Sequence, residues 1–180
     1  AALSQGGGLV PIVEPEVLMD GDHDIVRCRD VTEATLSEVF RALFDQGVVL
    51  EQMLLKPNMV IAGSDCAKQN SVDEVAHATI SSLLRTVPSA VPGIVFLSGG
   101  QSEKSATTHL NAMNALHHGL PWQLSFSYGR ALQASALKAW GGNADNVGAA
   151  QKAYAHRARL NGAARSGSYN DAMESERTAA

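Results

Sequence analysis

The strongest constraint on this chain is a short apolar run followed by a longer helical stretch, a pairing that occurs four times. The apolar runs lie at residues 9–13, 53–55, 94–97 and 124–126. They are rich in Val, Ile, Leu and Phe without strict alternation with polar residues, which is typical of parallel strands covered on both faces. The order predicts an α/β protein whose helices form right-handed crossovers between parallel strands.

Helix signals are clear in the stretches between and after these runs. Ser71 followed by Glu74 forms a capping box, which marks the start of one helix. The first four expected helices each end shortly before Gly or Pro, residues that stop helices. The expected helices span residues 25–45, 72–85, 103–117, 130–140 and 144–160. No element is expected before the first strand, and residues 161–180 are expected to form a flexible C-terminal tail.

Composition narrows the class of protein. Of the 180 residues, 45% are hydrophobic and 18% are charged, which fits one folded domain rather than a disordered chain. The net charge of −4 is spread along the chain, so we expect no nucleic-acid partner and no anionic-lipid surface. No apolar run approaches the roughly 20 residues of a membrane span. Cys28 and Cys66 are far apart and lack metal-type spacing, so we expect two reduced thiols in a cytoplasmic protein.

Two architectures fit the strand and helix order. One is a small open α/β sheet, and the other is part of a (β/α)8 barrel. The chain opens on Ala1 and reaches its first strand signal almost at once, so we expect a fragment. In both architectures the functional site lies at the carboxyl ends of the strands, and polar residues follow all four expected strands there.

Lys56 ends the second expected strand, directly after an apolar run and before Pro57. Burial disfavours the ammonium form and lowers the pKa of a fully buried lysine by as much as about 3–5 units. A neutral lysine can attack a carbonyl carbon and form a Schiff base. The alternative is a structural lysine that extends to water or pairs with a glutamate. The residues around Lys56 leave both interpretations open.

Glu14 and Glu16 flank Pro15 after the first expected strand. Side chains two apart in a strand share a face, so the two carboxylates are expected to repel each other. One of them then holds a proton near neutral pH and can act as a general acid. The alternative is a pair of solvated loop acids.

Two glycine-containing turns after the third and fourth expected strands suggest an anion site. Glycine lets backbone N–H groups approach a phosphate, and a helix N-terminus favours its negative charge. The second turn adds a guanidinium group that can bind phosphate through two hydrogen bonds. The candidate phosphate-binding residues are Ser98, Gly99, Ser127, Gly129 and Arg130.

The histidines lack the spacing of a zinc site, so no metal is expected. They are scattered over helices and loops and are expected to be solvated: His23, His77, His109, His117, His118 and His156. Trp122 and Trp140 lie beside turn signals and are expected to be packing residues.

Four segments together resemble the class I fructose-1,6-bisphosphate aldolases. They are LVPIVEPE at 9–16, LLKPNM at 54–59, FLSGGQS at 96–102 and FSYGRALQASALKAW at 126–140. The segments are long and occur in the family order, and the resemblance spans roughly residues 8–160. It implies a (β/α)8 TIM barrel of which residues 1–160 form the C-terminal half, about four β/α units.

The resemblance also implies an activity and roles for individual residues. The family cleaves fructose 1,6-bisphosphate to dihydroxyacetone phosphate and glyceraldehyde 3-phosphate in glycolysis and gluconeogenesis, without metal or cofactor, usually as a homotetramer. Lys56 corresponds to the imine-forming lysine, Glu14 to the acid/base glutamate and Glu16 to a supporting carboxylate. The phosphate-binding residues named above correspond to the site for the dihydroxyacetone phosphate group.

The resemblance has two departures. The aspartate that deprotonates the substrate hydroxyl, and the lysines near the other phosphate, lie in the first half of the family barrel. This chain is therefore expected to turn over little by itself. Many eukaryotic members end in a tyrosine, whereas the tail tyrosine here is Tyr169. The alternatives are a non-catalytic phosphosugar-binding module and a scaffold protein, and we expect the isolated chain to associate or aggregate.

Overall fold

The computed structural model describes residues 1–175, and within them four parallel strands form one sheet in the order β1-β2-β3-β4. Their bounds are Ile12–Val13 for β1, Leu54–Leu55 for β2, Gly93–Phe96 for β3 and Gln123–Phe126 for β4. The four predicted strands and their parallel pairing are confirmed. The first strand is shorter than predicted, because β1 lies at the edge of the sheet and pairs only with β2.

The helices begin and end close to their predicted bounds. The long helices are α2 at Ile25–Asp45, α3 at Val72–Thr86, α4 at Glu103–Leu116, α5 at Arg130–Trp140 and α6 at Val147–Arg165. Ser71 and Glu74 form the predicted capping box at the start of α3. Short 3-10 helices occur at Leu50–Gln52, Ala144–Asn146 and Asp171–Glu174.

Two predictions about elements near the chain ends are wrong. A short helix, α1 at Ala2–Gly6, precedes β1 although no element was expected there. The last helix ends at Arg165 rather than near residue 160, because Asn161 and Ala164 are fully buried against the body of the protein. Tyr169 is also buried, so the segment that follows α6 still packs on the core. The final five residues of the predicted tail lie outside the described part of the chain.

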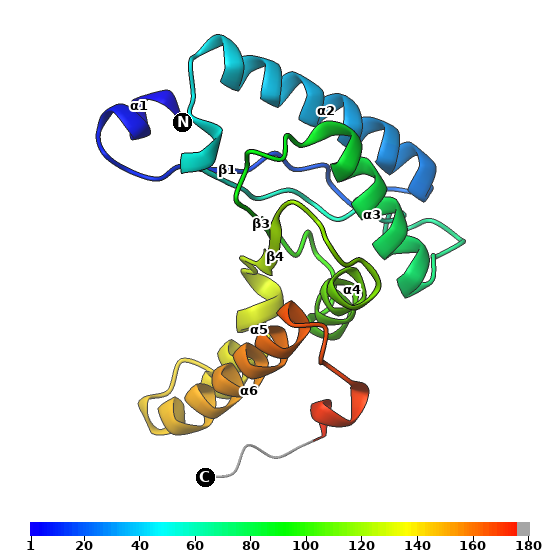
Figure 1. Cartoon of the computed structure of the whole chain (residues 1–180). Coiled ribbons are helices and arrows are strands. Elements are labelled where there is room, and N and C mark those ends of the chain that lie inside the picture. The colour runs from blue at the N-terminus through cyan, green and yellow to red at the C-terminus, as the bar shows by residue number, and fades with distance from the viewer. Residues whose placement is uncertain (176–180) are drawn as a thin grey trace.

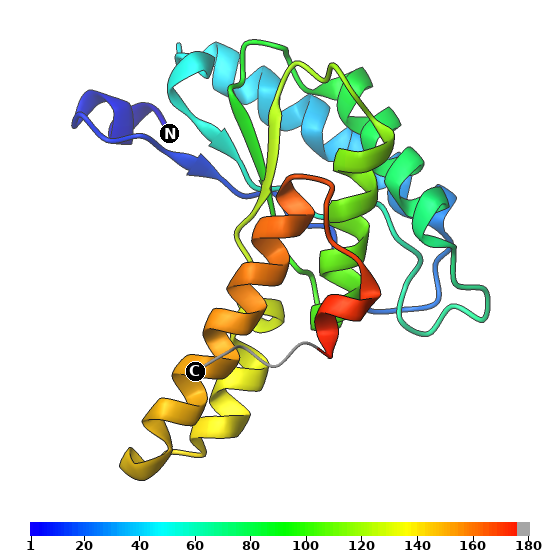
Figure 2. The same ribbon diagram turned by 60° about the horizontal axis from the view of Figure 1, so that its bottom comes forward.

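Helices α2, α3 and α4 cover one face of the sheet (Figures 1 and 2). Side chains alternate between the two faces of each strand, and Leu55, Ile94 and Phe96 are fully buried on the helix side. On the other face Ile12 is 53% exposed and Gln123 is also exposed. A doubly wound sheet carries helices on both faces, so this arrangement favours the half barrel over the open α/β sheet.

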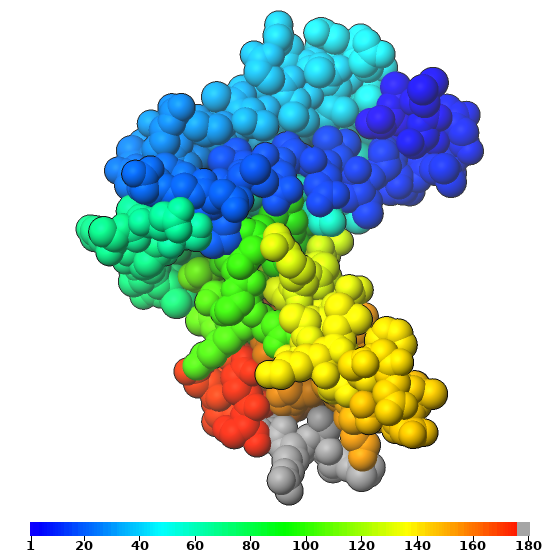
Figure 3. All heavy atoms as spheres, turned by 180° about the vertical axis from the view of Figure 1, so that it is seen from behind, coloured from blue at the N-terminus to red at the C-terminus, as the bar shows by residue number. Residues whose placement is uncertain are grey.

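The helices α5 and α6 lie side by side as an antiparallel pair that projects away from the sheet (Figure 2). Seen from behind, this pair and the N-terminal segment occupy opposite ends of the molecule (Figure 3). Trp122 is buried and donates from its indole nitrogen to the carbonyl oxygen of Pro88 at 3.0 Å, as a packing residue would. Trp140, at the end of α5, is instead 42% exposed.

The chain after α6 is attached by a buried polar network. Arg157 on α6 is almost fully buried and pairs with Glu174 at 2.8 Å. It also donates to the hydroxyl oxygen of Thr107 on α4, which in turn donates to Asn161 at 2.6 Å. Tyr169 donates to Glu174 at 2.8 Å. The network ties the segment that contains Asp171–Glu174 to both α4 and α6.

Candidate active site at the carboxyl edge of the sheet

Lys56 and Glu14 form an ion pair at the carboxyl edge of the sheet. Val13 pairs with Leu55, which places the next residues of the two strands beside each other. The backbone N–H of Lys56 donates to the carbonyl oxygen of Val13 at 2.7 Å, and its Nζ lies 2.9 Å from Oε1 of Glu14. The lysine side chain is 20% exposed and the glutamate side chain 48% exposed. Lys56 therefore has a carboxylate partner instead of a purely apolar environment.

Glu16 does not join this pair. It is exposed, and no ion pair within residues 1–175 involves it. Strand β1 ends at Val13, so the rule that residues two apart share a face does not extend to Glu16. The charged partner of Glu14 is therefore Lys56 and not Glu16.

Asn58 joins the segment after β1 to the segment after β2. Its buried side chain accepts a hydrogen bond from the backbone N–H of Val17 at 3.0 Å and donates to the hydroxyl of Thr32 on α2 at 3.1 Å. No role was predicted for Asn58 from the sequence. Its position two residues after Lys56, at the end of a buried strand, was the available signal.

The loops that follow β1 and β2 are also tied through their backbones. Gly63 donates to the carbonyl oxygen of His23 at 2.8 Å, and Ser64 donates to that of Met19 at 2.7 Å. Asp65 donates to the carbonyl oxygen of Gly21 at 2.9 Å. These hydrogen bonds fix the loop that carries the two glutamates against the loop that follows Lys56.

The two candidate phosphate turns come together beside Arg130. Gly99 and Gly100 have φ angles of 58° and 89°, a region that favours glycine, so a tight turn forms there. A side chain at Gly100 would lie 3.7 Å from the guanidinium of Arg130, which shows how near that cation lies to the turn. Arg130 is the first residue of α5, and within residues 1–175 no carboxylate forms a salt bridge with it. A cation at a helix N-terminus suits an anionic group.

Tyr128 anchors the second turn. The backbone N–H of Ser127 donates to the carbonyl oxygen of Phe96 at 2.9 Å, which continues the strand pairing into the turn. The buried hydroxyl of Tyr128 donates to the carbonyl oxygen of Ala106 on α4 at 2.9 Å. Burial raises the pKa of this phenol, so it remains a neutral donor. Gly129, which is exposed, precedes α5 directly.

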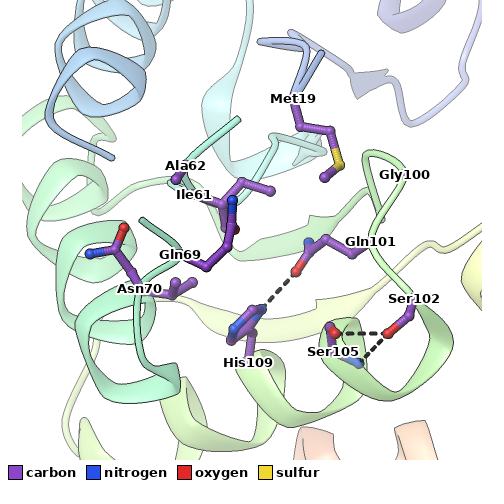
Figure 4. Close-up of a pocket in the computed structure, with 11 residues that line it drawn as sticks. Met19, Ile61, Ala62, Gln69, Asn70, Gly100, Gln101, Ser102, Ser105 and His109 are labelled. Carbon is purple, nitrogen blue, oxygen red and sulfur yellow. Dashed lines mark hydrogen bonds between the residues drawn. The ribbon is translucent and has the colours of Figure 1, made fainter. Parts of the chain in front are cut away.

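The expectation that all histidines are solvated is wrong for His109. Its Nδ1 lies 2.6 Å from Oε1 of Gln101, as Figure 4 shows. Desolvation by burial lowers the pKa of His109 to about 4. His77 and His117 also contact each other edge-on, with ring centroids 4.8 Å apart. Within residues 1–175 no group of three His, Cys, Asp or Glu side chains is positioned to hold a metal ion.

A small cavity lies behind the first phosphate turn. Its volume is about 180 Å³, and apolar side chains from three segments line it together with Gln101 and His109 (Figure 4). Met19, Ile61 and Val75 supply the apolar part. The cavity shares Gly100 with the turn.

Comparison with known proteins identifies the fold. A solved structure of fructose-bisphosphate aldolase from Plasmodium falciparum, in complex with TRAP and a small-molecule inhibitor, superposes with a TM-score of 0.91 at 52% sequence identity. The match covers 94% of this chain and 49% of that one. The four-stranded sheet and its helices are therefore part of a (β/α)8 TIM barrel, as predicted.

The sequence comparisons then give the family. Residues 1–180 match the family model described as fructose-bisphosphate aldolase class-I, and the chain belongs to this family. It is 59% identical to fructose-bisphosphate aldolase B of Gallus gallus and 57% identical to fructose-bisphosphate aldolase 2 of Caenorhabditis elegans, each over 169 residues. Each match covers 94% of this chain and 46% of the relative, so the chain spans about half the length of these relatives. In the described part of the chain, no helix is both long enough and apolar enough to cross a membrane.

Proposed function

We propose that the protein containing this chain is a Schiff-base aldolase that reversibly cleaves fructose 1,6-bisphosphate to dihydroxyacetone phosphate and glyceraldehyde 3-phosphate. The observation that carries the proposal is the Lys56–Glu14 pair, with 2.9 Å between Nζ and Oε1 at the carboxyl edge of the sheet. This edge is where barrel enzymes hold their active sites. Membership of the class I aldolase family supports the same reaction.

The pair places the two reacting groups side by side. A proton that passes from the ammonium of Lys56 to the carboxylate of Glu14 leaves a neutral amine beside a carboxylic acid. The amine attacks the C2 carbonyl carbon of the open-chain sugar, and the carbinolamine forms when the positively charged nitrogen passes a proton to the oxygen. Glu14 then protonates the hydroxyl, which departs as water while the nitrogen lone pair forms the C=N bond.

The protonated imine on Lys56 is an electron sink. When a base removes the proton from the C4 hydroxyl, the electron pair of the C3–C4 bond moves into the imine, and glyceraldehyde 3-phosphate departs. Protonation of the resulting enamine at C3 and hydrolysis of the imine release dihydroxyacetone phosphate and restore Lys56. The resemblance puts the C4-hydroxyl base in the half of the barrel that this chain does not include.

The turns after β3 and β4 are proposed to bind the phosphate of the dihydroxyacetone half. Ser98, Gly99, Ser127, Gly129 and Arg130 are the proposed contacts. The proximity of Arg130 to Gly100 supports this assignment, because one phosphate can then contact both turns. Glu16 is proposed to support Lys56, as the resemblance implies. The enzyme is further proposed to act without metal in the cytoplasm, as a homotetramer, which rests on the family.

Borohydride trapping tests the proposal. Full-length protein is incubated with dihydroxyacetone phosphate and sodium borohydride, and peptides are mapped by mass spectrometry. We expect the reduced adduct on Lys56, and we expect Lys56→Arg to abolish the adduct and lower kcat by at least about 10³-fold, because arginine forms no imine with a ketone. Lys68→Arg, on an exposed loop, is the matched control and should behave as the wild type. An unmodified Lys56 in the wild-type protein would refute the imine.

A second candidate function rests on the length of the chain. Because it spans about half of its relatives, the chain by itself can carry phosphate binding without complete cleavage chemistry. The isolated chain is therefore proposed to bind sugar phosphates with little turnover. Equal turnover by the isolated chain and by the full-length protein would contradict this.

A further inference from the structure

Ser98, at the start of the first phosphate turn, accepts two hydrogen bonds from the same residue. Its carbonyl oxygen accepts from the backbone N–H of Gln101 at 3.0 Å and from the side-chain Nε2 of Gln101 at 3.2 Å. The side chain of Gln101 thus adds a second hydrogen bond across the turn that contains Gly99 and Gly100. Ser98 itself is buried, so both donors replace water at this carbonyl.

His109 fixes the orientation of that glutamine. Because Nε2 of Gln101 donates to Ser98, its Oε1 faces His109 and can only accept a hydrogen bond. Nδ1 of His109, 2.6 Å away, must therefore carry the proton. Burial keeps the ring neutral at physiological pH, since the pKa of His109 is lowered to about 4. The neutral ring then has one N–H, on the nitrogen that faces Gln101.

The pair connects the turn to helix α4. His109 is the seventh residue of α4, at the end of its second turn, and Gln101 precedes the helix by two residues. Ser102 caps the same helix by accepting from the backbone N–H of Ser105 at 3.0 Å (Figure 4). The turn is consequently held at the carbonyl of Ser98 by Gln101 and at the start of α4 by the cap.

We propose that Gln101 and His109 are positioning residues that hold the turn of residues 98–100 in the shape that receives the substrate phosphate. Neither residue needs to touch the phosphate. His109 donates to Gln101, and Gln101 donates to Ser98, so the backbone N–H groups of the glycines keep a fixed direction. This inference rests on the proposed function, since it concerns the phosphate of the same substrate.

A comparison of two ketone substrates distinguishes a positioning role from general damage to the fold. Dihydroxyacetone phosphate and dihydroxyacetone both form the imine on Lys56, but only the first carries a phosphate. In His109→Leu of the full-length protein, we expect the concentration of dihydroxyacetone phosphate that half-saturates borohydride trapping to rise roughly three- to tenfold, as for the loss of one hydrogen bond. We expect the value for dihydroxyacetone to remain unchanged.

Two further variants complete the design. His109→Gln retains an N–H that can reach Oε1 of Gln101, so it should recover most of the affinity. His118→Leu removes an exposed imidazole just after the same helix and should leave both ketones unaffected. The cavity beside His109 leaves space for the leucine of the test variant, so we expect that variant to fold.

The outcomes distinguish this inference from the proposed function. Equal losses for both ketones, or no loss for either, would overturn the positioning role while the imine on Lys56 stands. If the wild type forms no imine, the positioning role is tested by titration with inorganic phosphate. The quantity measured is the shift of the backbone amide NMR resonances of Gly99 and Gly100. A weaker phosphate response in His109→Leu would then support the positioning role without the aldolase reaction, and an equal response would refute it.

Discussion

Gly63 has no room for a side chain. A Cβ atom there would lie 2.2 Å from the carbonyl oxygen of Gly21 and 2.8 Å from its carbonyl carbon, both backbone atoms. We expect Gly63→Ala to destabilise the protein by about 3 kcal/mol or more, because the two loops must separate. Thermal unfolding should show a midpoint lower by roughly 6–12 °C.

Gly162 is the matched control for this substitution. It is an exposed glycine within α6, and a Cβ there meets no atom within 4 Å. Gly162→Ala should be neutral or stabilise the helix by up to about 1 kcal/mol. A similar midpoint for both variants would show that the loop contact does not limit stability.

Single residues were predicted from sequence where the signal is local. Lys56 at a strand end and the glycines of residues 98–100 can be recognised from a few consecutive residues. The residues around Lys56 did not identify Glu14 as its partner, and only the family resemblance paired them, because the strand register that puts them side by side joins residues 42 positions apart. The Gln101–His109 pair was missed for a related reason: it depends on how a turn leads into a helix, and on burial that the sequence does not display.

At the scale of elements, the C-terminal segment depends on one buried ion pair. The side chain of Arg157 is 5% exposed and that of Glu174 is 24% exposed. We expect Arg157→Met to destabilise the protein by about 2 kcal/mol, since Glu174 and Thr107 lose their cationic partner inside the protein. Hydrogen exchange at residues 169–174 should become faster. Unchanged exchange in this segment would contradict the role assigned to Arg157.

The exposed pair in the same region provides the comparison. Lys104 and Asp171 form an ion pair at 2.8 Å, but their side chains are 56% and 69% exposed. Lys104→Met should therefore change the melting midpoint little.

Burial opposes ionisation of Glu174, but hydrogen bonds from Arg157 and Tyr169 outweigh it and lower the pKa of Glu174. Its contribution is complete above the ordinary carboxyl pKa of 4.5 and is lost as the pH falls through the lowered value, so the effect of Arg157→Met should shrink in acid.

Helices were predicted more accurately than strands or chain ends. The bounds of α2 and the capping box of α3 follow from periodicity and from residues within one turn. The end of α6 was placed too early, because its last turn contains small and polar residues whose burial depends on the distant helix α4. The bounds of β1 depend on its pairing with β2, so they could not be predicted from the residues of β1 alone.

At the scale of the whole molecule, the uncovered face and edges of the sheet govern solution behaviour. Leu9, Val10 and Ile12 are 53–67% exposed along and beside the edge strand β1. Strand edges with unpaired backbone groups promote association. We expect the isolated 180-residue chain to sediment as oligomers or aggregates.

Ile12→Lys should reduce this association, because a charge on an edge strand opposes pairing. Leu84→Lys places the same charge on helix α3 at a residue that is 56% exposed, and it should leave the sedimentation coefficient unchanged. A monomeric, cooperatively melting wild-type chain would rule out the expected association.

The strand order β1-β2-β3-β4 follows the order of the chain. Each strand therefore pairs with the strand that precedes or follows it in sequence, and a cut in a loop between two β/α units divides the sheet along a single row of hydrogen bonds. Both pieces keep their own strands together with the helices that cover them. Such a protein is suited to reconstitution from separately made polypeptides that pair again along that row of hydrogen bonds.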